Sequence, residues 1–208
     1  MYLFCKRFLD IIVSASLLVF LSPLFVVIAL AIKGTSKGPV FYRGERAGLD
    51  GHAFFMLKFR TMVANAENVG GFSTAINDPR FIKGGRVLRK YKLDELPQLI
   101  NVLRGQMSLV GPRPQVFYYV NQYNDDELKI LTMKPGITDI ASIYFSDMDV
   151  VLGSGDVDRK YETEIEPKKN ELRLLYIKKA SLFFDLKILF YTFAKLIKIP
   201  TPNDLFKG

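Results

Sequence analysis

Apolar residues concentrate near the start of the chain, where residues 8–32 contain a single charge, at Asp10. A helix rises about 1.5 Å per residue, so this run supplies the roughly 20 residues that a bilayer-spanning helix needs. Ser22 and Pro23 interrupt it near the middle, because proline lacks an N–H and restricts the residue before it. Each half is then about eleven residues, or roughly 16 Å, which is too short to span alone. We predict two helices with a break at Ser22-Pro23, where the serine hydroxyl satisfies a freed carbonyl.

Positive charges flank this segment on both sides, and Lys and Arg at the ends of a membrane segment favour the cytoplasmic face. A re-entrant helix hairpin over residues 1–33, which enters and leaves by the same face, fits both the break and the charges. A kinked single span and a cleaved signal peptide are the alternatives, although the run exceeds the roughly 7–15 apolar residues of a signal peptide. The flanking cations are Lys6, Arg7, Lys33, Lys37, Arg43 and Arg46.

The pattern after this segment predicts a mostly helical α+β fold with one small β-hairpin. Residues 39–43 and 53–59 are expected to form two strands, because residues 48–51 between them have the chemistry of a turn, with glycine at both ends. Alternate residues of a strand share a side, so the second strand is expected to present Lys58 and Arg60 on one face.

Apolar residues then recur with the period of an α-helix, at i, i+3, i+4 and i+7. These positions are Leu96, Leu99, Ile100 and Leu103. Pro97 suits the first turn of such a helix, where a missing N–H leaves no bond unmade. Asp94 is therefore expected at the positive end of the helix dipole, which keeps a carboxylate ionised. A short basic helix over residues 86–92 is expected to lead into it.

An Asp-Glu pair at a helix start is ordinarily no more than a solvated helix terminus. Beside Asp94 and Glu95, however, several cations lie nearby in the sequence. An ionised carboxylate held among cations is a plausible nucleophile toward phosphorus, since the cations can neutralise the charge of an incoming phosphate. These cations are Arg86, Arg89, Lys90 and Lys92.

A rigid extended segment is predicted at residues 111–114. Each proline fixes its own φ and restricts the residue before it, so Pro112 and Pro114 hold Arg113 in one backbone state. A fixed guanidinium suits hydrogen bonding to a diphosphate or to the edge of a uracil.

The C-terminal region contains a second apolar stretch, at residues 182–199, in which aromatic side chains alternate with three lysines. This mixture is typical of an interfacial helix whose lysines reach the headgroups, and a helix of a soluble core is the alternative. A polar loop is predicted at residues 65–78, and an acidic stretch at residues 147–169 is predicted to be irregular around Gly153-Ser154-Gly155.

The composition of the chain limits the classes of partner that it is expected to bind. The chain has 208 residues, 49% of them hydrophobic, and a net charge of +8, so we expect one domain and anionic partners. Nucleic acid is disfavoured because no motif for groove or single-strand recognition is visible. A single cysteine, Cys5, excludes an internal disulfide. His52 is the only histidine, which argues against histidine-based triads and zinc sites with several histidines.

Five segments in one chain resemble the bacterial sugar transferases, the small monotopic phosphoglycosyl transferases. They follow the family's order between about Lys6 and about Thr192. The segments are the N-terminal apolar run, Lys58-Phe59-Arg60-Thr61-Met62, Leu93-Asp94-Glu95-Leu96-Pro97-Gln98, Val110-Gly111-Pro112-Arg113-Pro114 and Lys134-Pro135-Gly136-Ile137-Thr138. The chain departs from the family pattern at Gln106, where an acid is usual, at Asp139-Ile140 in place of Gly-Trp, and at Arg173 in place of an Asp.

The resemblance implies a single domain, with a cytoplasmic catalytic part at residues 34–208, at the cytoplasmic face of the bacterial inner membrane. It implies transfer of a sugar-1-phosphate from a nucleotide sugar, with UDP expected, to polyprenol phosphate, giving a polyprenyl diphosphate sugar and UMP. In the family mechanism the Asp of the pair, here Asp94, forms a covalent phosphosugar intermediate. Glu95 maps to the partner acid, which assists proton transfer or orients the acceptor.

The resemblance also implies Mg²⁺ at Asp94, and contacts to phosphate and nucleotide from Lys58, Arg89 and Arg113, the last held by its flanking prolines. A catalytically silent membrane-anchored scaffold that binds lipid phosphate is the alternative, but retention of Asp94, Glu95 and Arg113 together argues against it. These motifs specify a reaction class and leave open the sugar, the glycan pathway and the oligomeric state.

Overall fold

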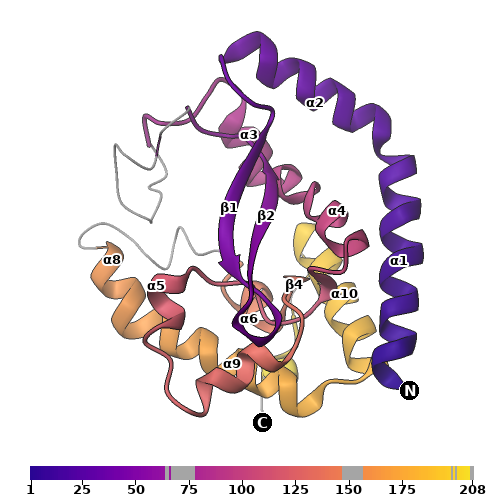
Figure 1. Cartoon of the computed structure of the whole chain (residues 1–208), viewed down its shortest axis with the longest axis vertical. Helices are drawn as coiled ribbons and strands as arrows, with labels where there is room; N and C mark the ends of the chain where they lie inside the picture. The colour runs from indigo at the N-terminus through magenta and orange to yellow at the C-terminus, as the bar shows by residue number, and fades with distance from the viewer. Residues whose placement is uncertain (64–65, 67–77, 147–156, 198, 200, 207–208) are drawn as a thin grey trace.

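The computed structural model describes the chain apart from residues 64–65, 67–77, 147–156, 198, 200 and 207–208 (Figure 1). It confirms a mostly helical α+β fold with a small antiparallel sheet. The N-terminal half contains α1 (Tyr2–Phe20), α2 (Ser22–Thr35), β1 (Phe41–Ala47), β2 (Ala53–Phe59), α3 (Gly85–Lys90) and α4 (Gln98–Leu103). The C-terminal half contains β3 (Ser108–Val110), α5 (Phe117–Val120), β4 (Gly136–Thr138), α6 (Ile140–Tyr144), α8 (Val157–Lys160), α9 (Glu166–Lys179) and α10 (Leu182–Leu196).

The predicted break in the apolar run is confirmed. The axes of α1 and α2 differ by 61°, and the Ser22 hydroxyl donates to Val19 O at 2.8 Å. Pro23 lies in the first turn of α2, where its missing N–H is tolerated. Within the described residues, no single helix is both long and apolar enough to cross a membrane, but α1 and α2 together meet that test as a bent pair.

Polar side chains of α1 attach this helix to the rest of the protein. The Arg7 guanidinium donates to Val102 O (2.6 Å) and Leu103 O (2.9 Å), which are carbonyls at the end of α4. Asp10 Oδ1 accepts from Leu109 N in β3 at 2.9 Å. Because these groups face inward, α1 is a fixed part of the fold.

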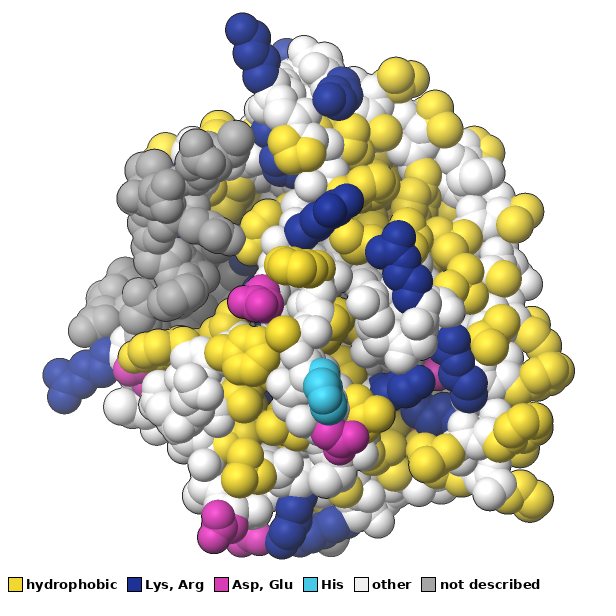
Figure 2. Space-filling model, in the orientation of Figure 1, with side chains coloured by type: hydrophobic (Ala, Val, Ile, Leu, Met, Phe, Trp, Pro, Cys, Tyr) yellow, Lys and Arg dark blue, Asp and Glu magenta, His cyan; other side chains and the backbone are white. Residues whose placement is uncertain are grey.

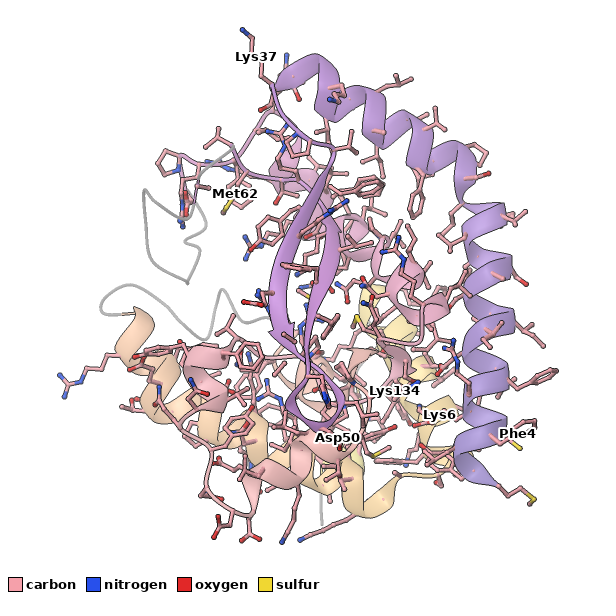
Figure 3. The ribbon with its side chains drawn as sticks, viewed as in Figure 1. Phe4, Lys6, Lys37, Asp50, Met62 and Lys134 are labelled. Atoms are coloured by element: carbon pink, nitrogen blue, oxygen red, sulfur yellow. The ribbon has the colours of Figure 1, made fainter. Side chains whose placement is uncertain are left out.

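A buried ion pair adds to this attachment, since Lys6 Nζ lies 2.7 Å from Asp185 Oδ2 in α10, 179 residues away in the sequence. Lys6 points toward the interior, whereas Phe4 points away from it (Figure 3). Hydrophobic side chains gather on the outer side of α1 and α2 (Figure 2). The buried residues of α1 are therefore polar, whereas those of α2 are apolar, and the outer side of the pair is apolar.

The β-hairpin pairs Phe41 with Phe59 and Ala47 with Ala53. Its first strand continues to Ala47, four residues beyond the predicted end, because pairing with β2 satisfies the backbone of a charged stretch that has no apolar alternation. Asn101 of α4 then closes the outer edge of β2: it accepts from Leu57 N (2.9 Å) and donates to Phe55 O (2.8 Å). This contact fixes β2 against the helix that follows Asp94.

Two glycines bring β3 and β4 together as a parallel pair. A Cβ added at Gly111 would lie 2.4 Å from Lys134 O, and one added at Gly136 would lie 2.1 Å from Gly111 N. No other residue type fits so close a backbone approach. The glycines thus join the segment of Arg113 to the segment that begins at Lys134.

The helix α10 buries Ile188 completely in the main core, together with Tyr176 of α9. Its other side is an exposed apolar stripe. The stripe consists of Phe183, Leu186, Phe190, Phe193 and Ile197.

The predicted loop at residues 65–78 and the predicted irregularity around residues 153–155 fall mostly outside the residues that the structure describes. From Val157 onward, the acidic stretch is helical through α8, a π-helical turn over Tyr161–Ile165, and α9. Pro167 lies in the first turn of α9, so it does not interrupt the helix.

Candidate active site

Asp94 lies in a 3₁₀ turn, Leu93–Glu95, which precedes α4. The predicted α-helix thus begins later than expected, at Gln98, because Lys92 adopts a left-handed conformation (φ 57°) that turns the chain after α3. The basic helix is also shorter than predicted, since α3 ends at Lys90. The placement of Asp94 at the dipole of an α-helix is therefore corrected to a tight turn with little dipole of its own.

Glu95 forms ion pairs with two of the predicted cations, Lys58 and Arg113. Its Oε1 accepts a hydrogen bond from Lys58 Nζ at 2.8 Å and a second, charge-assisted one from Arg113 Nη2. Lys58 comes from β2 and Arg113 from the extended segment after β3, so three separate sequence motifs meet at one carboxylate.

The backbone around Arg113 is held as well. Its N–H donates to Asp139 Oδ2 and its Nη1 donates to Ile137 O, both at 3.0 Å. Pro112 and Pro114 are buried on either side, and Pro112 O accepts from Gly136 N at 3.0 Å. These bonds hold the backbone and the guanidinium of Arg113, which donates to the Glu95 carboxylate.

The neighbouring positive charges determine the protonation state of Glu95. Burial acts to raise the pKa of Glu95, but the charges of Arg113 and Lys58 outweigh it and hold that pKa well below its usual range. The charge of Glu95 in turn raises the pKa of Arg113. Burial lowers the pKa of Lys58, while the charge of Glu95 acts to raise it. Lys58 and Arg113 share the Glu95 carboxylate, an arrangement that suits an anionic ligand.

Asp94 differs sharply from its neighbour. Burial raises its pKa, while the charges of Lys58, Arg89 and Lys92 act in the opposite direction. The cations therefore favour the ionised form of Asp94, as expected, but the opposite effect of burial on its pKa is larger. Asp94 makes no hydrogen bond or ion pair with any described residue, and its Oδ1 is fully buried without a partner.

The free carboxylate fits Mg²⁺. This ion is commonly held by one or two carboxylates together with waters and substrate phosphates, so it needs no cage made only of protein. Within the described residues, no group of three or more His, Cys, Asp or Glu side chains gathers that could hold a metal without a substrate. Glu95 already accepts from Lys58 and Arg113, whereas Asp94 pairs with no described side chain.

Two other predicted cations, Arg89 and Arg60, do not contact Glu95 in the described structure. Arg89 of α3 lies over the Phe81 ring, 5.7 Å from its centroid, and its charge acts on Asp94. Arg60 follows the end of β2 and turns away from Lys58, since its Nη1 donates to Lys37 O at 2.8 Å and its Nη2 to Ser36 O at 3.0 Å. The Lys58–Arg60 face predicted from strand alternation therefore contributes only Lys58 to the site.

An apolar cluster connects this site to the bent helix pair. Ile28 and Ile32 of α2 are buried with Phe59 of β2, and Leu93 and Leu96 pack against them on either side of the Asp94–Glu95 pair. The turn that carries Asp94 is therefore fixed directly to the second helix of the pair.

Sequence reasoning missed the role of Asp139, which is fully buried. Besides accepting from Arg113 N, its carboxylate caps α6 by accepting from Ser142 N at 2.6 Å. The spacing of an Asp three residues before a Ser at a helix start is a usable signal for such a cap.

Lys169 was also missed. Its ammonium lies 4.6 Å from the centre of the Tyr161 ring and donates to the Tyr161 hydroxyl at 3.1 Å. Burial, together with the charges of Arg173 and Arg113, lowers its pKa to about 7. Arg173, at the position where the resembled family has an Asp, pairs internally with Glu166 at 2.7 Å.

Comparison with known proteins agrees with this geometry. A family model described as "Bacterial sugar transferase" matches residues 1–199. The chain is 42% identical over 193 residues to UDP-glucose:undecaprenyl-phosphate glucose-1-phosphate transferase of Klebsiella pneumoniae, which covers 91% of this chain and 39% of that protein. It thus spans well under half the length of that relative.

Two further relatives differ in length. The chain is 36% identical over 203 residues to UDP-N-acetylgalactosamine-undecaprenyl-phosphate N-acetylgalactosaminephosphotransferase of Aeromonas hydrophila, covering 94% of this chain and 44% of that protein. It is also 36% identical over 202 residues to Exopolysaccharide production protein ExoY of Rhizobium meliloti, covering 90% of this chain and 83% of that protein.

Proposed function

Because the chain belongs to the bacterial sugar transferase family, we propose that it transfers a sugar-1-phosphate from a UDP-sugar to a polyprenol phosphate such as undecaprenyl phosphate. The observation that carries this proposal is a buried carboxylate without a partner, Asp94, next to a carboxylate that holds two cations, Glu95. The relatives named for undecaprenyl phosphate and UDP-sugars support the choice of substrates.

In the proposed reaction, an oxygen of Asp94 attacks the β-phosphorus of the donor. A new bond forms between that oxygen and phosphorus, the bond from phosphorus to the bridging oxygen breaks, and UMP leaves with the electron pair. An oxygen of the polyprenol phosphate then attacks the same phosphorus and releases Asp94. The sugar keeps its bond to phosphate throughout, which is the expected outcome of attack at phosphorus rather than at the anomeric carbon.

Glu95 is assigned to orientation rather than to proton transfer. A carboxylate whose pKa is held far below its usual range is a poor proton carrier near neutral pH. Its contacts instead keep Lys58 and Arg113 side by side, where both can meet the diphosphate. Arg89 of α3 adds a further positive charge that acts on Asp94.

Mg²⁺ is proposed to bind at Asp94 together with the donor diphosphate, where it would neutralise charge on the phosphates. Asp94 supplies a carboxylate that makes no ion pair with a described side chain.

A membrane location at the cytoplasmic face follows from the acceptor. A long isoprenoid tail stays in the bilayer, so the active site must lie at the height of the headgroups. The outer apolar face of the α1–α2 pair and the exposed stripe of α10 suit such a surface. We propose that α1 and α2 form a re-entrant hairpin.

The proposal is tested with purified protein, a panel of UDP-sugars, Mg²⁺ and polyprenol phosphate in detergent micelles. We expect one UDP-sugar to give UMP and a polyprenyl diphosphate sugar in equal amounts. The unphosphorylated polyprenol serves as the control and should give no lipid product and no UMP beyond about one equivalent of the enzyme. Release of UDP would indicate attack at the sugar carbon, and lipid binding without turnover of any nucleotide sugar would favour a scaffold.

A further inference from the structure

Gln98 is the first residue of α4, and its side chain is fully buried. Neither its amide nitrogen nor its amide oxygen has a hydrogen-bond partner in the described part of the chain. A buried amide without a partner is destabilising, and such groups in folded proteins usually mark a strained, catalytic or ligand-filled position. Asn101, equally buried one turn later, has its amide satisfied by Leu57 N, Phe55 O and Gln106 Oε1. Gln98 is therefore the exception in its own helix.

Helix geometry directs Gln98 toward Asp94. Leu96 and Pro97 both have helical φ and ψ, so the turn of Asp94 continues into α4. Side chains four positions apart share a face of a helix, and each leans back over the preceding turn. Asp94, Gln98 and Val102 are all buried along this face. Gln98 therefore lies about one turn after the nucleophile on a continuous helical path, and both side chains are buried.

The two side chains have complementary needs. Gln98 Nε2 is a donor without an acceptor, and Asp94 Oδ1 is an acceptor without a donor, and both are fully buried. The two nearest cations, Lys58 and Arg113, donate to Glu95 and make no described bond to Asp94. Of the two Asp94 oxygens, only Oδ1 is both fully buried and without a partner. Oδ2 is therefore the oxygen that a substrate can reach.

We propose that Gln98 is the positioning residue of the nucleophile: its amide N–H donates to Asp94 Oδ1 and holds Oδ2 toward the β-phosphorus. This inference rests on the proposed function, because it assigns Gln98 to the covalent half-reaction at Asp94. The proposed bond requires the two side chains to turn toward each other in the complex with the donor. Gln98 touches neither the sugar nor the nucleotide.

The test uses Gln98→Met, which keeps the length of the side chain and removes both polar atoms. Removing an unpaired buried amide should raise the melting temperature of the ligand-free full chain, by about 3 °C or more. The same change should lower kcat about 10- to 100-fold, because a misplaced nucleophile reacts slowly. The KM for the UDP-sugar should stay within about twofold, since Gln98 does not contact the donor.

Ser14→Ala is the matched control. Ser14 in α1 is also fully buried with an unpaired hydroxyl, and it lies outside the site, so kcat should not change. Asp94→Asn separates the two proposals. If Asp94→Asn is inactive while Gln98→Met keeps kcat within twofold of the wild type, the role of Gln98 is wrong and the proposed function stands. If Asp94→Asn is active, the proposed function fails first.

Stability distinguishes positioning from a structural role. If Gln98→Met and Gln98→Leu both melt at lower temperature than the wild type, or lose a cooperative transition, the amide is already satisfied in the free protein and the inference is overturned. A higher melting temperature together with a lower kcat and a slower release of UMP from donor alone supports it. A purely structural residue would not move stability and kcat in opposite directions.

Discussion

Replacing Asp94 by Asn is expected to reduce turnover by roughly four or more orders of magnitude while the protein still folds. Loss of a covalent nucleophile removes the first bond-forming step, and effects of this size are typical of such losses. The measurement is the rate of UMP release at saturating donor and acceptor. The matched control is Asp125→Asn, an exposed carboxylate of the loop after α5, which should leave the rate unchanged.

The expected effect of Asp94→Asn on stability has a definite sign. The pKa of Asp94 is raised in the folded protein, mainly by burial, so the fold favours the neutral form and is weakened as pH rises through that pKa. Asn is neutral at every pH, and the melting temperature at neutral pH should therefore equal or exceed that of the wild type. A variant that unfolded, or that kept more than a tenth of the activity, would contradict the assignment.

The second large effect concerns the bent helix pair. Replacing Ser22-Pro23 by Ala-Leu removes the helix break, so the segment can form one straight helix of about 25 apolar residues, long enough to cross a bilayer. In the wild type, a cysteine placed before Tyr2 in a Cys5→Ser background should react with a membrane-impermeant thiol reagent only after the cells are opened. In the variant, a fraction should react from outside.

Straightening this segment also has a cost that the structure makes explicit. Moving the start of α1 across the membrane would leave Asp185 buried without Lys6, and breaking such a pair typically costs about 3–5 kcal/mol. The variant should therefore melt at a lower temperature in proportion to the outward fraction. Changing Val26-Val27 to Ala-Leu, which leaves the break intact, should do neither. External labelling of the wild type would eliminate the re-entrant model.

The sequence predicted best those features that depend on local chemistry. The break at Ser22-Pro23 follows from the missing N–H of proline, and the rigid state of Arg113 follows from its two flanking prolines. The convergence of Lys58, Glu95 and Arg113 was expected from the family's motifs, and the structure brings these three side chains together.

Features that depend on distant contacts were not predictable from a local pattern. The meeting of Lys6 with Asp185 joins the two ends of the chain, and no sequence spacing encodes it. The separation of Arg60 from Lys58 depends on where β2 ends and on the carbonyls of Ser36 and Lys37. The left-handed Lys92, which moves Asp94 into a 3₁₀ turn, is likewise set by packing rather than by residue type.

The helix that follows Asp94 shows why a hydrophobic stripe alone does not identify the buried residues. The apolar positions of the stripe include Leu96 and Ile100, which are only half-buried, whereas the polar residues Gln98 and Asn101 are fully buried. Asn101 is buried because it satisfies the edge of β2, a contact that hydrophobicity does not report. The buried polar residues beside the candidate nucleophile can be identified only from the three-dimensional structure.

The central claim is the covalent phosphosugar intermediate on Asp94, and the most direct test omits the acceptor. Purified protein, UDP-sugar and Mg²⁺ alone should release up to about one equivalent of UMP, and the Asp94 peptide should gain the mass of a sugar phosphate by mass spectrometry. Asp94→Asn should show neither change, and added polyprenol phosphate should discharge the adduct. Release of UDP, or a first nucleotide release that requires the acceptor, would contradict the mechanism.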